Sequence, residues 1–123
     1  EKAEEIKRKV GLSNTAEYPN IKTGVMPVLN SLSAEIKNIL KFHAEHSDKQ
    51  AQKVLLLGGS AKLKSLPEVL LSQLQDDGVT QVLQANPWQN IPQLKEQIIN
   101  PYEALSYVTA IGLAMRGVKY EAN

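Results

Sequence analysis

A glycine-rich turn, Gly58-Gly59-Ser60, directly follows a short apolar run at residues 54–57 and precedes Lys62. Glycine has no Cβ, so a flat ring or a phosphate group can approach the backbone closely at such a turn. Backbone N–H groups in turns and at helix starts favour anionic groups. Ser60 can add a hydroxyl, and Lys62 can add a positive charge on an aliphatic stem. The turn is a candidate nucleotide-binding element, although Gly-Gly also makes ordinary strand-to-helix turns.

The spacing around this turn excludes two familiar phosphate-binding motifs. No Gly-Lys-Ser/Thr follows, as a P-loop requires, and the three spaced glycines of a dinucleotide fingerprint are absent. No recognisable motif places a histidine base beside Ser60, which argues against a hydrolase triad. His43 and His46 could hold a metal ion with Glu45 or Asp48, but a partly solvated helix end is the simpler interpretation.

Two strands and one helix are predicted to position the turn. The apolar run is typical of a strand covered on both faces, as in a parallel sheet. A helix should follow from Ser65 as N-cap, with Pro67 in its first turn and Glu68 three residues after the cap. A second strand is predicted at residues 80–83, parallel to the first. In open α/β sheets ligands bind beyond the carboxyl ends of the strands, which is where the glycine turn falls.

A long amphipathic helix is predicted before the first strand. A polar loop at residues 13–24 should precede it, and Pro27 is tolerable only near its first turn. Residues at spacings of three and four form its apolar stripe. They are Val25, Leu29, Leu32, Ile36, Ile39, Leu40 and His43.

The remaining helices lie at the two ends of the chain. A charged helix at residues 1–10 should stop at Gly11. A short helix is predicted at residues 92–98, and a last one at residues 103–116 that ends at Gly117. Gly112 inside that last helix indicates tight helix–sheet packing.

Composition limits the class of protein. The chain has 123 residues, enough for one compact domain. Its 14 basic and 13 acidic residues nearly cancel, whereas dedicated nucleic-acid binders show a clear basic excess. Cysteine is absent, so disulfides and thiolate chemistry are excluded, and no apolar run is long enough to span a bilayer.

The first residues suggest a cut through a longer protein, because the chain opens without Met and inside a charged helical pattern. Two parallel strands alone leave both sheet edges open. We therefore expect an α/β chain with few parallel strands flanked by helices, in an incomplete sheet whose other strands come from elsewhere.

Residues 54–63, Val-Leu-Leu-Leu-Gly-Gly-Ser-Ala-Lys-Leu, resemble the adenosine motif of the actin-like ATPase superfamily. Residues 3–8 resemble the superfamily helix that closes over adenine and ribose from the opposite subdomain. Glu4 and Lys7 share one face of that helix because they are three residues apart. The resemblance implies that both contact ribose or adenine.

Further segments resemble the PilM family of type IV pilus assembly. Residues 27–42 are similar to its long helix before the adenosine motif, residues 84–88 to its Asn-Pro segment, and residues 107–117 to its terminal helix. The resemblance implies the C-terminal part of an actin-like (ribonuclease H-like) ATPase fold. Residues 1–24 would then come from the smaller upper subdomain, and residues 25–123 from the larger nucleotide-binding subdomain.

The same resemblance implies roles at the glycine turn. Gly58 and Gly59 would bring the backbone against adenosine and its first phosphate, and Ser60 and Lys62 would flank the adenine. The cofactor would be ATP, with magnesium ligands outside these residues. The chain alone is expected to hold half of a nucleotide cleft and not to hydrolyse ATP.

Family resemblance also implies a cellular setting. PilM-type proteins are expected in the cytoplasm, peripheral to the inner membrane, where they bind the tail of a PilN-like membrane protein and communicate with pilus motor ATPases. Three alternatives stay open at this point. They are an FtsA-like cell-division protein, a sugar-kinase-type phosphotransferase of the same fold, and a plain interaction module in which the glycine turn is only structural.

Overall fold

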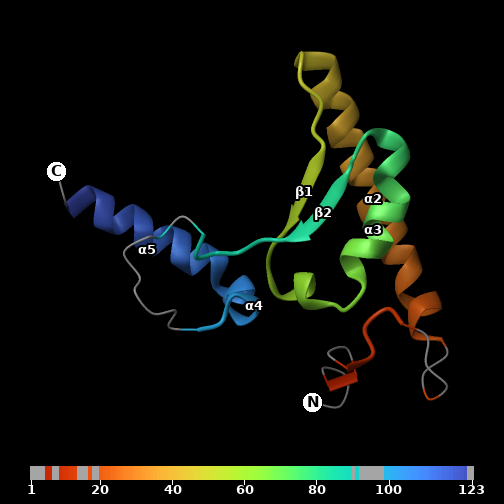
Figure 1. Ribbon diagram of the computed structural model, residues 1–123, viewed down its shortest axis with the longest axis horizontal. Coiled ribbons are helices and arrows are strands. Elements are labelled where there is room, and N and C mark those ends of the chain that lie inside the picture. The colour runs from red at the N-terminus through yellow and green to blue at the C-terminus, as the bar shows by residue number, and fades with distance from the viewer. Residues whose placement is uncertain are drawn as a thin grey trace. The chain divides into compact units, whose positions relative to one another are not determined.

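The computed structural model describes residues 5–6, 9–13, 17, 20–89, 91 and 99–121. The elements alternate between helices and two short strands (Figure 1). In chain order they are α2 (Ile21–His46), β1 (Lys53–Leu56), η1 (Gly59–Lys62), α3 (Leu66–Leu74), η2 (Gln75–Asp77), β2 (Gln81–Gln84), α4 (Pro101–Ala104), η3 (Leu105–Tyr107) and α5 (Val108–Glu121).

The chain divides into two compact units. The first comprises Glu1–Leu56 and Leu63–Leu83, and the second comprises Leu57–Lys62 and Gln84–Asn123. The first unit holds the sheet and its covering helices, while the second holds the glycine turn and the terminal helices. None of the helices in the described residues is long and apolar enough to cross a membrane.

The sheet consists of β1 and β2, which pair as neighbours. Their arrows point the same way in Figure 1, and α3 connects them, so the predicted parallel strand–helix–strand unit is confirmed. Both α2 and α3 lie on one side of this sheet (Figure 1). The core forms between the helices and that sheet face. Its buried members are Leu12, Leu29, Leu66, Leu70, Leu74, Val79 and Val82.

Coverage of the sheet differs from the prediction. Val54 and Leu56 pack against the core, but Leu55 between them is 54% exposed and Leu83 on β2 is 44% exposed. Within the described part of the first unit, the expected cover on both faces is therefore wrong. The reason is that α2 and α3 both lie on one side, so alternate side chains of the apolar run point to an open face.

Helix α2 begins earlier than predicted. It starts at Ile21, so Gly24 is helical and Pro27 falls beyond the first turn, where the prediction did not allow it. The buried residues of the helix are Leu29 and Ser33. The hydroxyl of Ser33 donates a hydrogen bond to the side-chain oxygen of Gln73 on α3, so this buried polar group has a hydrogen-bond partner.

The predicted stripe of α2 is only partly buried. Val25, Ile36 and Leu40 pack against the core as expected. Leu32 and Ile39 are among the exposed large apolar residues of the chain, although the spacing placed them on the stripe. His43 is also exposed. The buried face of α2 is therefore rotated about the helix axis from the predicted face, and Ser33 is buried instead of Leu32.

Helix α3 (Leu66–Leu74) begins where predicted but lacks its predicted cap. Ser65 occupies the N-cap position, yet its φ is 64° and its side chain makes no cap hydrogen bond. The capping box is therefore wrong, because a left-handed N-cap does not aim its hydroxyl at the first-turn amides. Its Oγ lies 3.5 Å from the Oγ of Ser13 instead. At the other end Gly78, with φ 87°, closes η2.

The described residues near the start of the chain confirm Gly11 as a helix stop. The Val10 amide donates to the Ile6 carbonyl at 2.8 Å, and Gly11 then turns with φ 61°. The next amide, that of Leu12, donates to the Lys64 carbonyl at 3.0 Å. Leu12 itself is buried, so this hydrogen bond and the packing of Leu12 hold the chain at Gly11 and Leu12 against the residues that precede α3.

The terminal helices of the second unit extend beyond the prediction at both ends. Helical structure begins at Pro101, after Asn100, whose side chain accepts a hydrogen bond from the Glu103 amide at 2.8 Å. It continues to Glu121 through Gly117, so the predicted stop there is wrong. A Cβ added at Gly112 would meet nothing within 4 Å in the second unit, and the expected packing of this helix on a sheet stays a prediction. The helix predicted at residues 92–98 lies outside the described residues.

Candidate functional site

The glycine turn belongs to the second unit and is built around a left-handed glycine. Gly58 has φ 87°, a conformation that favours glycine, and its amide donates to the Leu105 carbonyl at 2.9 Å. The chain then winds into η1, with the Ala61 amide donating to the Gly58 carbonyl at 3.1 Å. The turn is thus tied to the terminal helices by its first residue.

Hydrogen bonds fix the far side of the turn as well. Ala61 is buried, and its carbonyl accepts from the Gln84 side-chain amide at 2.6 Å. The Lys62 carbonyl accepts from the Tyr102 hydroxyl at 2.7 Å. Since both ends of η1 are held, the backbone of Gly59 and Ser60 is presented by a defined scaffold and not by a free loop.

The backbone of this turn is bare. A Cβ added at Gly58 would meet nothing within 4 Å, and one added at Gly59 would meet only the Ser106 Oγ, at 3.8 Å. Backbone conformation explains why residue 58 is glycine. It does not explain Gly59, whose φ lies outside the left-handed range and whose Cβ would make an ordinary contact. Among the described residues of the second unit, the missing side chain at Gly59 leaves space that only the Ser106 hydroxyl approaches.

Four of the six predicted binding residues lie together on this turn. Ser60 is exposed beside the glycines. Lys62 is half-buried, and its Nζ lies 5.4 Å from the centroid of the Tyr102 ring. The other two, Glu4 and Lys7, lie outside the described residues.

Two residues next to the turn were missed by the sequence analysis. Ser106 presents its hydroxyl to the space beside Gly59. Tyr102 holds Lys62 twice, through the backbone hydrogen bond and through the ring under the ammonium group. Both residues lie forty or more positions from the residues they contact, so no local pattern could have revealed them.

Trp88, which follows the Asn-Pro segment, has a role inside the second unit. Its indole N–H donates to the Ile99 carbonyl at 3.0 Å, and its backbone amide donates to the Asn86 Oδ1 at 3.0 Å. The ring is half-buried. These contacts favour a structural role for Trp88 in positioning the segment that leads to α4.

The histidine pair does not form a metal site in the described residues. His46 Nδ1 lies 2.8 Å from the Phe42 carbonyl, and its ring stacks on Phe42 with centroids 4.2 Å apart. Among the described residues, no group of three histidine, cysteine or acidic side chains could hold an ion. The contacts of His46 are those of a helix end.

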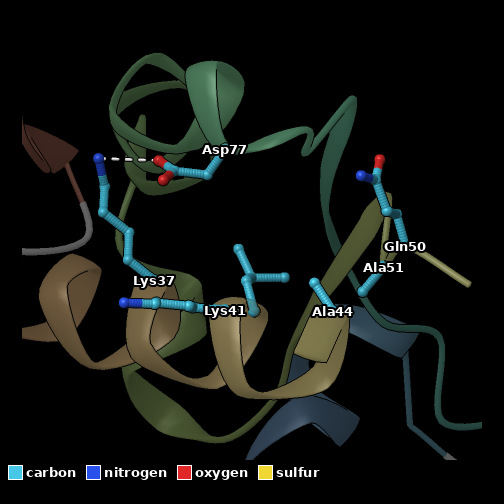
Figure 2. Close-up of a pocket in the computed structure, with 7 residues that line it drawn as sticks. Lys37, Lys41, Ala44, Gln50, Ala51 and Asp77 are labelled. Atoms are coloured by element: carbon cyan, nitrogen blue, oxygen red, sulfur yellow. Dashed lines mark ion pairs between the residues drawn. The ribbon is translucent and has the colours of Figure 1, made fainter. Parts of the chain in front are cut away.

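A hollow of about 230 Å³ lies in the first unit, and none of the residues that line it is a predicted site residue. Figure 2 shows Lys37 and Lys41 on α2 along one side and Gln50 and Ala51 along the other. Lys37 reaches across to Asp77, with its Nζ 2.8 Å from the carboxylate (Figure 2). This ion pair offsets the charges of Lys37 and Asp77, and Lys41 adds a further positive charge to the lining.

Comparison with known families decides the identity. Residues 1–118 match the family model of the type IV pilus assembly protein PilM. The chain belongs to the PilM family. The match spans nearly the whole sequence and confirms the family predicted from the long helix at residues 27–42, the Asn-Pro segment and the terminal helix. Membership of the PilM family supports a role in type IV pilus assembly. No curated protein and no solved structure matches the chain significantly.

Proposed function

We propose that this chain forms the adenosine side of an ATP-binding cleft in a PilM-type, actin-like scaffold of type IV pilus assembly. In this proposal residues 25–123 belong to the larger nucleotide-binding subdomain of a ribonuclease H-like fold. Residues 1–24 contribute a helix and linker from the smaller subdomain. The remaining strands and the phosphate-binding elements come from sequence outside this chain.

The observation that carries the proposal is the bare backbone at Gly59. A glycine that the turn does not need, on a segment held at both ends by hydrogen bonds, leaves room for a flat ring against the main chain. The turn directly follows β1, at the carboxyl edge of the sheet, where ligands bind in open α/β folds. The PilM family match agrees with the pilus-assembly setting of this proposal.

Each residue of the turn then has a role. Gly58 and Gly59 allow adenosine and its first phosphate to lie against the backbone. Ser60 supplies a hydroxyl to the adenine, and Lys62 covers it with its aliphatic stem while Tyr102 fixes the orientation of Lys62. Glu4 and Lys7 contact ribose or adenine from the opposite lip.

ATP would act as the link between the two subdomains, because a nucleotide that contacts both favours their closure. Magnesium would be held by acidic residues outside this chain. Closure would change the contacts of the scaffold with a PilN-like membrane-protein tail and with the pilus motor ATPases. The protein would work in the cytoplasm, peripheral to the inner membrane.

The test is the ATP affinity of the full-length protein and two arginine variants. Gly59→Arg places a long side chain in the space proposed for the nucleoside, and we expect at least about tenfold weaker binding, or 1.4 kcal/mol. Gly112→Arg is the matched control, since Gly112 is exposed on α5 and a Cβ there meets nothing. Equal ATP affinity of the two variants, with both folded by circular dichroism, would refute the role of this turn.

A further inference from the structure

A hydroxyl group from the terminal helices borders the bare backbone of the glycine turn. Apart from the glycine's own chain neighbours, a Cβ built at Gly59 would have one atom of the described residues within 4 Å, the Oγ of Ser106 at 3.8 Å. Ser106 belongs to η3, and its side chain is exposed. A serine hydroxyl can both donate and accept a hydrogen bond. The space that Gly59 leaves open therefore has a polar group at its border.

Two hydrogen bonds hold the segment that carries Ser106 against the turn. The Gly58 amide donates to the carbonyl of Leu105, the residue before Ser106, at 2.9 Å. The Tyr102 hydroxyl donates to the Lys62 carbonyl at 2.7 Å. One bond lies before the bare position of the turn and the other lies after it, and Leu105 is buried. The Ser106 hydroxyl is therefore preorganised at this position, which lowers the entropic cost of binding a ligand there.

The hydroxyl of Ser106 is not used within its own helical segment. A serine in a helix commonly donates a hydrogen bond to a carbonyl one turn earlier. Ser31 on α2 donates to the Pro27 carbonyl in this way, at 3.1 Å. Ser72 on α3 donates to the Val69 carbonyl at 2.7 Å. Ser106, by contrast, makes no hydrogen bond with any described residue, so its hydroxyl is available to a ligand.

Charge indicates which group of a nucleotide this hydroxyl would bind. Lys62 is the one charged residue of the turn, and its positive charge favours an anionic group there. A phosphate oxygen accepts a charge-assisted hydrogen bond, which is roughly twice as strong as a bond between neutral groups such as two hydroxyls. Of the three phosphates of ATP, the first is the one proposed to lie against Gly58 and Gly59. It is therefore the anionic group that falls beside Ser106.

We propose that Ser106 is a further nucleotide-binding residue, whose hydroxyl donates a hydrogen bond to an oxygen of the α-phosphate. This inference rests on the proposed function, because it takes a nucleotide at Gly59 as given. It adds a contact from η3 to those of the turn itself. Both segments belong to the second unit, so the nucleotide would be held by two parts of that unit that are distant in sequence.

The first test is the ATP affinity of the full-length protein, measured by isothermal titration calorimetry. Ser106→Ala removes the hydroxyl and should weaken ATP binding about tenfold, as the loss of one hydrogen bond to a charged group allows. Ser106→Thr keeps a hydroxyl and should retain most of the affinity. Thr109→Ala is the matched control, because it removes another exposed hydroxyl from the terminal helices, one that does not border Gly59. It should leave the affinity unchanged.

The second test identifies the phosphate by the ³¹P NMR signals of ATP bound to the full-length protein. Ser106→Ala should shift the α-phosphate signal and leave the β and γ signals in place, whereas a general defect of the fold would move all three.

The outcomes separate this inference from the proposed function. If Gly59→Arg weakens ATP binding but Ser106→Ala does not, the turn keeps its role and only the assignment of Ser106 is overturned. The same holds if Ser106→Thr is as weak as Ser106→Ala, or if the α-phosphate signal does not shift. If the unmodified protein does not bind ATP, or Gly59→Arg binds it equally well, the proposed function fails and the role of Ser106 fails with it.

Discussion

The addition of one methyl group at Gly11 is expected to destabilise the fold strongly. Gly11 turns the chain with φ 61° just before Leu12, which is buried and hydrogen-bonded to Lys64. A Cβ added at Gly11 would lie 2.6 Å from the Lys64 carbonyl oxygen and 2.8 Å from the Lys64 Cα. Both neighbours are backbone atoms, so they cannot move aside as the end of a flexible side chain can.

Two costs therefore add in the Gly11→Ala variant. A left-handed conformation costs a non-glycine residue about 1–2 kcal/mol, of which about 0.4–1 kcal/mol is offset by the lower entropy of the unfolded chain. Separating the two backbone segments strains the junction and weakens the bond from the Leu12 amide to the Lys64 carbonyl, which adds about 1–3 kcal/mol. We expect a net loss of about 3 kcal/mol in the free energy of unfolding.

Urea unfolding followed by circular dichroism measures this loss. Gly24→Ala is the matched control, because Gly24 lies in α2 and a Cβ there meets nothing within 4 Å. Alanine should stabilise that helix by up to about 1 kcal/mol. If Gly11→Ala unfolds within about 0.5 kcal/mol of the unmodified chain, the close approach of Gly11 to Lys64 is not a feature of the folded state.

Three other substitutions test separate parts of the fold. Leu74→Ala removes a side chain with no exposed surface and should cost about 2–5 kcal/mol in urea unfolding; a loss below about 1 kcal/mol would contradict its place in the core. Ser65→Gly should stabilise by about 1 kcal/mol, because φ is 64° there and no cap hydrogen bond is lost; destabilisation of that size would indicate a working N-cap. Asn100→Ala removes the cap of the terminal helices and should cost about 1 kcal/mol, seen as faster hydrogen exchange at the Glu103 amide; unchanged exchange would argue against the cap.

The order of the elements could be predicted from the sequence because local patterns determine it. Apolar spacing marks α2, Ser65 and Pro67 mark the start of α3, and a short apolar run marks β1. Other features depend on tertiary structure. An apolar run does not say how many layers cover a strand, and so the exposure of Leu55 was missed. The residue types at Ser65 and three positions later match a capping box. In the structure, however, Ser65 lies next to the junction with Gly11 and Leu12 and adopts a left-handed conformation.

At the candidate site, the residues that are contiguous in sequence could be predicted and the distant ones could not. Gly58, Gly59, Ser60 and Lys62 form one segment, and a glycine pair after a strand is a local signal. Tyr102 and Ser106 approach that segment only through the folding of the second unit. The pairing of Glu4 and Lys7 with the turn stays a prediction, since both lie outside the described residues.

The backbone amide signals of Gly59 and Ser60 test the central claim most directly. In an NMR titration of the full-length protein with ATP, we predict that these signals and that of Lys62 shift and saturate together. The amide signals of residues around the hollow lined by Lys37 and Asp77 should not shift. If ATP binds while the signals of the glycine turn do not move, the nucleotide lies elsewhere and the proposed role of Gly59 is wrong.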